Sequence, residues 1–274
     1  MKITFYGVRG SIAAPGPETA GYGGNTTCLE MITGGGYRMI VDAGTGMRKL
    51  GLKLLGEKDV PTIPIFVTHV HWDHIQGLPF FLPIYMPRFK LMFVADNECF
   101  DRLYNTLYEQ MDGYVFPADL QEVQSQVKFQ IIDKSGFDFG GAHIDTIRNN
   151  HPVPAYGIRA AENGKKFCFL TDNELKSDRP QTDYSRFVEF CRDADILVHD
   201  AQYTEEDMKK TRGWGHSTFM ETVALAEEAG VRKLIFTHHD PERTDKQLDG
   251  IIEEVKTKTK IQVAGAKEGE TLEL

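Results

Sequence analysis

Three histidines and one aspartate lie within six residues of this chain, at His69, His71, Asp73 and His74. They follow Ile63–Val67, an apolar run rich in β-forming residues that predicts a buried strand. Imidazole and carboxylate groups together suit zinc, iron or manganese. Because six residues cannot surround one ion with all four side chains, the spacing indicates ligands that are shared between two neighbouring ions.

Three more polar residues come directly after predicted strands: His151 after 143–148, Asp172 after 167–170 and His238 after 234–237. Any one of them alone would be interpreted as a turn or capping residue. With the first four they complete a set of seven candidate metal ligands: His69, His71, Asp73, His74, His151, Asp172 and His238. The sequence therefore predicts a dinuclear metal site built at strand ends.

The bulk composition is that of a globular protein: 274 residues, 41% hydrophobic and 26% charged. A net charge of −9 argues against a protein that grips long nucleic acid by its phosphates, although bound metal ions would still allow a small anionic substrate. The four cysteines have no CxxC spacing, and no signal peptide or membrane-length apolar run is present. We expect reduced thiols, a cytoplasmic location and no contact with membranes.

Predicted strands and helices alternate along the chain without a linker or a low-complexity segment. Strands are predicted at 3–6, 26–33, 37–41, 63–67, 91–95, 127–132, 143–148, 155–160, 167–170, 196–199 and 234–237, and helices at 47–55, 97–110, 184–191, 217–229 and 246–256. We interpret the chain as a single domain over 1–274 with two halves, approximately 1–125 and 126–274. Two sheets packed face to face, with helices outside and the polar site where the sheets meet, satisfy this pattern.

The sequence HVHWDH at 69–74 resembles the HxHxDH signature of the metallo-β-lactamase superfamily, and the downstream histidines and aspartate fit its remaining metal positions. The resemblance implies an α/β (α+β) fold, a four-layer αββα sandwich that spans nearly the whole chain. It also implies two divalent metal ions, with zinc expected and manganese as the alternative. Carried over, one ion is held by His69, His71 and His151, the other by Asp73, His74 and His238, and Asp172 bridges them.

Two further segments resemble the ribonuclease Z branch of that superfamily. Val198–Thr204 (VHDAQYT) is similar to its HEAT-like motif, and Gly213–Thr218 (GWGHST) to its HST motif. In that branch an acidic residue and a histidine act together on the leaving group, which here would be Asp200 and His216. Aspartate stands where glutamate is common, so the reach of the acid is one methylene shorter. The expected catalytic residues are Asp73, Asp200 and His216.

Simpler interpretations of these two segments remain open. Ser217 or Thr218 would serve as a helix N-cap, His199 as a structural histidine and Asp200 as a turn cap. The functional interpretation has a chemical reason, however. Attack of a metal-bridging hydroxide on a phosphodiester expels an alkoxide, which leaves poorly unless it is protonated. Lactams and thioesters need this device less, so its presence favours a phosphodiester.

Four residues are assigned weaker roles as ligand-orienting or substrate-binding groups. Asp42 ends a predicted strand and would orient a ligand histidine or cap a turn. Arg9 would reach a phosphate or lie on the surface. His199 and His239 would support the site from behind the ligands.

His143 is interpreted as structural. Three aromatic residues, Trp214, Tyr114 and Phe116, would stack on a nucleobase or pack in the core. The last two lie in 111–120, a segment without periodicity that would form a cap, an interface loop or an ordinary connection.

Three enzymes and one non-enzyme compete as the function. Segments such as 7–11, 22–26, 42–46 and 238–242 resemble phosphoribosyl cyclic phosphodiesterase and cyclic nucleotide phosphodiesterase-type metallo-hydrolases, which favours a small cyclic phosphodiester as substrate. A ribonuclease Z that processes tRNA 3′ ends would need the basic, glycine-rich arm of that family, which the sequence lacks. The third enzyme is a lactonase or thioesterase, and the non-enzyme is a non-catalytic metal-binding scaffold. The resemblance also implies a homodimer, and no stable nucleic-acid complex is expected.

Overall fold

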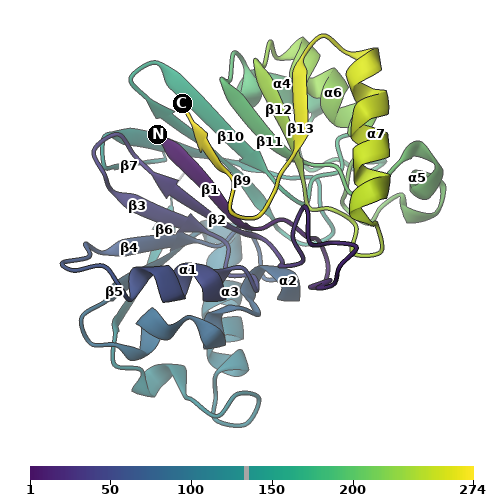
Figure 1. Ribbon diagram of the computed structural model, residues 1–274. Coiled ribbons are helices and arrows are strands. Elements are labelled where there is room, and N and C mark those ends of the chain that lie inside the picture. The colour runs from purple at the N-terminus through teal and green to yellow at the C-terminus, as the bar shows by residue number, and fades with distance from the viewer. Residues whose placement is uncertain (133–135) are drawn as a thin grey trace.

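Two seven-stranded sheets lie face to face in the computed structural model, which describes residues 1–132 and 136–274 (Figure 1). The first sheet has the order β14-β1-β2-β3-β4-β5-β6, with β1 Lys2–Gly7, β2 Cys28–Ile32, β3 Arg38–Val41, β4 Ile63–Phe66, β5 Lys90–Asp96, β6 Gln126–Ile132 and β14 Thr271–Glu273. The second has the order β13-β12-β11-β10-β9-β8-β7, with β7 Phe137–Phe139, β8 Ala142–Arg148, β9 Tyr156–Glu162, β10 Lys165–Leu170, β11 Ile196–Asp200, β12 Lys233–Thr237 and β13 Gln262–Gly265.

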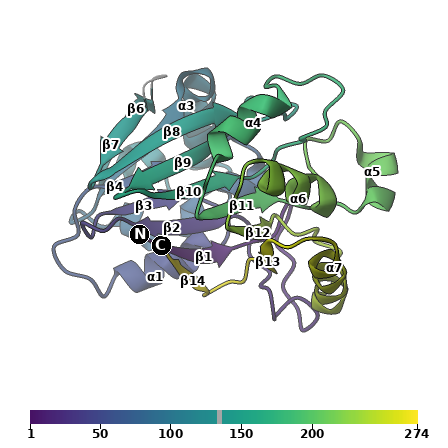
Figure 2. The ribbon, with the colours of Figure 1, turned by 90° about the horizontal axis from the view of Figure 1, so that it is seen from above.

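Helices cover the outer face of each sheet (Figures 1 and 2). Those beside the first sheet are α1 Met47–Leu54, α2 Trp72–Ile75 and α3 Asn97–Gln110, and those beside the second are α4 Tyr184–Cys191, α6 Phe219–Glu228 and α7 Asp245–Lys258, with α5 Glu205–Thr211 at the edge. The expected four-layer αββα sandwich is thereby confirmed. Among the residues described, no helix is both long and apolar enough to cross a bilayer.

Strand β10 contributes apolar side chains to both faces of its sheet. Phe167 and Phe169 belong to the apolar cluster between the sheets. Cys168 and Leu170 point to the opposite face and join the cluster beneath the helices. A strand with apolar neighbours on both faces reads as a continuous apolar run, because successive side chains alternate between the two faces.

The sheet boundary differs from the expected division near residue 126. Strand β6 pairs in parallel with β5: Lys90 lies opposite Gln126 at one end and Asp96 opposite Ile132 at the other. Strand β6 therefore belongs to the first sheet. The C-terminal strand β14 returns to pair with β1. Hydrophobic pattern predicts that a strand exists, but its partner depends on contacts that are distant in sequence.

Helix α5 and strand β7 are among the short elements that lie outside the predicted set. Helix α5 begins with a capping box in which Thr204 and Asp207 bond each other's backbone N–H groups. The spacing of threonine and an acidic residue three positions later is a signal for it. Strand β7 has only three residues, too few to show alternation.

Candidate metal centre and catalytic dyad

The seven candidate ligands converge from the ends of several strands. Strand β4 leads into the histidine motif, β8 into His151, β10 into Asp172 and β12 into His238. Strands β10, β11 and β12 are parallel, so their carboxyl ends lie together at one edge of the sheet. The motif then turns into α2, which carries Asp73 and His74 in its first turn.

The first group of ligand atoms comes from His69, His71, His151 and Asp172, and these atoms lie within 4.8 Å of one another. His151 Nε2 and His71 Nδ1 face each other at 3.1 Å. His69 Nε2 lies 3.7 Å from Asp172 Oδ1. Three of the four side chains are buried and His71 is exposed, so the group is reachable from solvent on one side.

The second group comes from Asp73, His74 and His238, all buried. Asp73 Oδ2 lies 3.1 Å from His238 Nε2 and 3.3 Å from His74 Nε2. Asp172 Oδ2 lies 3.1 Å from His74 Nε2 and 3.4 Å from His238 Nε2. One carboxylate oxygen of Asp172 therefore faces each group, which is the placement that a bridging ligand needs.

The donor set fits two divalent cations. His69 Nε2 is buried without a hydrogen-bond partner among the described residues, and His74 Nε2 has the carboxylate oxygens of Asp73 and Asp172 as its polar neighbours. Buried polar atoms are rarely left unpaired in a folded protein, and a metal ion would satisfy His69 Nε2 while His74 and the two carboxylates supplied further ligand atoms. Imidazole nitrogens combined with carboxylate oxygens are typical of zinc and of other divalent transition metals.

The ligand histidines are oriented by hydrogen bonds at their other ring nitrogen. Asp42 lies 2.8 Å from Nδ1 of His74 and also accepts from the backbone N–H of Thr68. Gln202 Oε1 lies 2.9 Å from Nδ1 of His238. In both residues the bond at Nδ1 leaves Nε2 directed at the cluster, which is the usual way a protein fixes a metal-binding tautomer. The expected orienting position of Asp42 agrees with this geometry.

Three of these strand ends have backbone in the left-handed region. The φ angles are 61° at Asp42, 54° at Asp172 and 58° at His238. Residues other than glycine adopt such angles infrequently, and where they do the surrounding structure must hold them. Each of these residues directs a polar side chain into the centre, so the unfavourable backbone coincides with the site.

Asp200 and His216 form a buried pair beside the metal ligands. His216 Nδ1 lies 2.6 Å from Asp200 Oδ2. The His216 ring stacks on His238 at 5.0 Å, and one of its ring nitrogens lies within 4.8 Å of ligand atoms of Asp172 and His238. The helix that follows is capped by Thr218, in agreement with one of the simpler interpretations, and His216 lies two residues before that cap.

The position of Arg9 differs from both expectations. Its side chain is fully buried and donates from Nε to the carbonyl of Gly23 and from Nη1 to the carbonyls of Asp240 and Arg243. Nη2 lies 3.5 Å from Asp245. The guanidinium is engaged by the protein itself, so Arg9 joins the N-terminal loops to the segment before α7 and is not placed to bind a phosphate.

His199 and His239 are both buried behind the strand ends. His199 donates from Nδ1 to the carbonyl of Asp200, and its Nε2 accepts from Asn173. His239 donates from Nε2 to the carbonyl of Ala266. Burial lowers the pKa of both imidazoles, that of His239 to about 3. His199 therefore contacts Asn173, the residue that follows the candidate ligand Asp172. His239 instead packs against the ring of Tyr22.

The aromatic candidates have different environments. Phe116 packs edge-on against Phe80 with ring centroids 5.4 Å apart. Tyr114 is 95% exposed and Trp214 is 61% exposed. Trp214 lies two residues before His216, so it is the aromatic side chain of this set nearest to the site in the chain. His143 lies at the far end of its strand, beside Asp138.

Sequence reasoning missed two glycines that the site requires. A Cβ on Gly10 would lie 2.4 Å from His238 Nδ1, and a Cβ on Gly215 would lie 2.0 Å from His151 Nδ1. Gly215 also has a φ of +92°, which side chains disfavour. Gly10 follows Arg9 and Gly215 precedes His216, and the sequence analysis singled out those neighbours instead. The contact of each glycine with a ligand ring arises only in the folded chain.

Gly215→Ala should displace His151 and weaken metal binding. The added methyl group overlaps the imidazole, so either the ligand or the loop before His216 must shift. We expect metal affinity to fall by about 10- to 100-fold, as for lost support of a metal ligand. Metal titration would measure the loss. Gly213→Ala, also at positive φ but with no atom near its Cβ, is the matched control and should retain more affinity.

Metal binding should release protons. Burial lowers the pKa of His238, but Asp172 and Asp73 outweigh it and raise the pKa to about 9 in the metal-free protein. The pKa of His74 is raised in the same sense, against its burial, by Asp73, Asp172 and Asp42. A metal must displace these protons, so apparent affinity should increase as pH rises towards 9.

Calorimetry in buffers of different ionisation enthalpy would count the protons released. The same pKa shift stabilises the metal-free fold fully below pH 6.5, the ordinary histidine value, and this contribution is lost as pH rises through about 9. Metal-free protein should therefore become less stable over that interval. A metal affinity that is independent of pH would contradict the assignment.

The fold and the paired ligand groups define a metallo-β-lactamase-type hydrolase. The family model described as a beta-lactamase superfamily domain matches residues 37–239, and the chain belongs to this family. The expected class, a metal-dependent hydrolase, is thereby confirmed. Over 301 residues the chain is 28% identical to the ribonuclease Z of Archaeoglobus fulgidus, covering 93% of this chain and 92% of that protein.

Two solved structures share the fold along their whole length. Human tRNase Z, short form, superposes with a TM-score of 0.68 at 20% identity, covering 100% of this chain and 99% of that one. A diphosphatase of the PhnP family superposes with a TM-score of 0.69 at 21% identity, covering 100% and 97%. At these identities the structures define the common architecture and leave the substrate open.

Proposed function

We propose that this protein is a dinuclear metal-dependent phosphodiesterase that hydrolyses a small cyclic phosphodiester, such as a cyclic nucleotide or phosphoribosyl cyclic phosphate. The metals are zinc, with manganese as the alternative. His69, His71 and His151 would hold one ion, Asp73, His74 and His238 would hold the other, and Asp172 would contact both. The observation that carries the proposal is the Asp200–His216 pair directly beside this ligand cluster.

Different residues would bind the metal ions, orient the ligand histidines and protonate the leaving group. Two bound cations would lower the pKa of a water for attack on phosphorus and offset charge on the phosphoryl oxygens. Asp42 and Gln202 hold ligand imidazoles in the orientation that makes this possible. Burial of the ligands keeps the site in a medium of low dielectric, where such charge interactions are stronger.

The leaving alkoxide needs a proton, and His216 is placed to supply it. Its Nδ1 is bonded to Asp200, so its other ring nitrogen is the one available to the reacting group. Asp200 is itself held in place, because its Oδ1 accepts from the backbone N–H of Gln202 at 3.0 Å. A histidine held by a carboxylate in this way is a common general acid.

Processing of tRNA 3′ ends is the second candidate, favoured by the ribonuclease Z relative. Two observations weigh against it. The net charge is −9, whereas proteins that hold structured nucleic acid present basic surfaces. In the two described ranges no glycine-rich, basic arm projects from the sandwich, and segment 111–120 carries two aspartates with Tyr114 and Phe116 instead.

A substrate panel with metal content measured on the same sample tests the proposal. It contains 3′,5′- and 2′,3′-cyclic nucleotides, phosphoribosyl cyclic phosphate, bis-p-nitrophenyl phosphate and a precursor tRNA with a 3′ trailer. We expect turnover of at least one cyclic phosphodiester and no trailer removal. Trailer removal without turnover of any cyclic compound would instead establish the second candidate.

A further inference from the structure

The proposed general acid, His216, lies at the end of a loop, residues 212–216, that belongs to no helix or strand. This general-acid loop connects α5 to α6. Two of its residues, Gly213 and Gly215, have φ angles of +88° and +92°, which glycine adopts without strain. Asp200 bonds the ring of His216 and leaves the main chain of the loop to be held by other groups.

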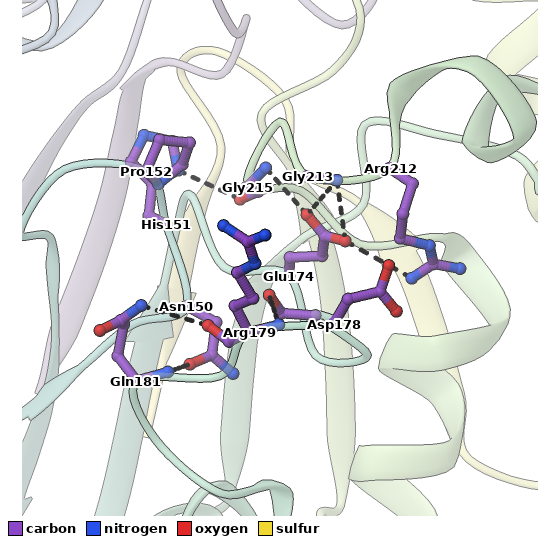
Figure 3. Close-up of a pocket in the computed structure, with 11 residues that line it drawn as sticks. Asn150, His151, Pro152, Glu174, Asp178, Arg179, Gln181, Arg212, Gly213 and Gly215 are labelled. Atoms are coloured by element: carbon purple, nitrogen blue, oxygen red, sulfur yellow. Dashed lines mark hydrogen bonds and ion pairs between the residues drawn. The ribbon is translucent and has the colours of Figure 1, made fainter.

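The carboxylate of Glu174 accepts hydrogen bonds from two N–H groups of the general-acid loop (Figure 3). The N–H of Gly213 donates to Oε2 at 2.9 Å and to Oε1 at 3.1 Å, and the N–H of Gly215 donates to Oε2 at 3.1 Å. Backbone N–H groups that converge in this way form a small concavity that binds an anion. Here the anion is a side chain of the protein itself, and Glu174 is only 1% exposed.

The buried negative charge strengthens this attachment. Hydrogen bonds from backbone N–H groups to an ionised carboxylate are roughly twice as strong as neutral ones. Arg212 offsets part of the cost of burying the charge, because its Nη1 lies 3.5 Å from Oε1 of Glu174. Glu174 therefore holds the general-acid loop more firmly than a neutral side chain of the same shape would.

Glu174 is also connected to two of the candidate metal ligands. It lies two residues after Asp172. Its own N–H donates at 2.9 Å to the carbonyl of Asn150, the residue before His151. His151 in turn donates from Nδ1 to the carbonyl of Gly215 at 3.3 Å. These bonds join the general-acid loop to the segments that carry both ligands.

We propose that Glu174 is a positioning residue, which holds the general-acid loop so that the imidazole of His216 stays beside the metal ligands. Asp200 sets the orientation of the ring, and Glu174 sets the position of the main chain that carries it. A displacement of about 1 Å at a reacting group can slow a reaction by roughly 10²-fold, so this attachment has a kinetic consequence. The inference rests on the proposed function for the role of His216, but the attachment of the loop has a test of its own.

Amide hydrogen exchange tests the attachment without any substrate. Glu174→Gln keeps the shape of the side chain, but its terminal NH2 group cannot accept a hydrogen bond. The N–H groups of Gly213 and Gly215 should then exchange faster by roughly tenfold or more, the usual worth of a hydrogen bond to a charged group. Unchanged exchange at both glycines would overturn the inference, whether or not any phosphodiester is turned over.

Glu162→Gln is the control for the loss of a buried carboxylate. Glu162 is also buried, and its two oxygens accept from the N–H of Gly34 at 2.9 and 2.8 Å. It ends β9, whereas Tyr156 at the start of that strand bonds the carbonyl of Thr68 beside the histidine motif. Its substitution should speed exchange at Gly34 and leave the general-acid loop protected.

The kinetic test compares two leaving groups in the metal-loaded protein. Glu174→Gln should reduce kcat for a cyclic nucleotide by roughly 10- to 100-fold and kcat for bis-p-nitrophenyl phosphate by less than about threefold, because nitrophenolate needs little protonation. KM should change little, and two metal ions should remain bound. Equal slowing of both substrates, or a leaving-group dependence that Glu162→Gln shares, would exclude the positioning role. Faster exchange at the two glycines without turnover of any phosphodiester would instead count against the proposed function alone.

Discussion

Replacing Asp172 by alanine should leave the protein with fewer than two bound metal ions and almost no activity. One oxygen of this carboxylate faces His69 and the other faces His74 and His238. Its removal takes a ligand from both ions at once. Because metal ions supply several kcal/mol of transition-state stabilisation, we expect the rate to fall by roughly 10³-fold or more.

Metal analysis and thermal unfolding would measure the loss. Added zinc should raise the melting temperature of the parent protein but have little effect on Asp172→Ala, since only a bound ligand stabilises the folded state. Asp195→Ala is the control, because that carboxylate bonds Lys165 and Arg232 away from the site. Two metal ions per chain and full activity in Asp172→Ala would exclude its bridging role.

The convergence of the seven candidate ligands could be predicted because each of them lies shortly after a strand in the sequence. A buried strand is a local pattern, and polar residues directly after it lie at the sheet edge. Helices α3 and α4 were predicted with their observed bounds for a similar reason, since their apolar spacing and their first residues are local signals. The sequence therefore indicated the seven candidate ligands and their position directly after strands.

What the sequence did not predict depends on contacts between distant segments. Arg9 is buried because three carbonyl groups accept from it, two of which come from Asp240 and Arg243, more than two hundred residues away. Gly215 must be glycine because the fold brings it against His151. Strand β6 joins the first sheet by pairing with β5. None of these has a signal in the local pattern.

The Asp200–His216 pair was indicated by local sequence motifs, but its surroundings depend on contacts between distant segments. The motif resemblance indicated both residues, and the structure places them 2.6 Å apart and beside the ligand cluster. Neither spacing nor composition could show which groups surround them. Their chemical role is accessible to an experiment that varies the leaving group.

His216→Ala should slow the hydrolysis of substrates with alkoxide leaving groups far more than that of p-nitrophenyl phosphodiesters. An alkoxide is a poor leaving group unless it is protonated, so loss of the general acid should reduce kcat by about 10²- to 10⁴-fold. Nitrophenolate needs little protonation, and its release should slow by less than about tenfold. Steady-state kinetics with a cyclic nucleotide and bis-p-nitrophenyl phosphate would give the two ratios.

Asp200→Asn separates positioning from proton donation. It keeps the shape of the side chain but removes the charge that holds His216 Nδ1 at 2.6 Å, so it should reproduce the leaving-group dependence to a smaller extent. Bound metal should remain at two ions in both variants if His216 acts on the substrate. Loss of a metal ion in His216→Ala, with equal slowing of both substrate types, would make His216 a ligand of the second ion, since its ring nitrogen also lies within 4.8 Å of the ligand atoms of Asp172 and His238.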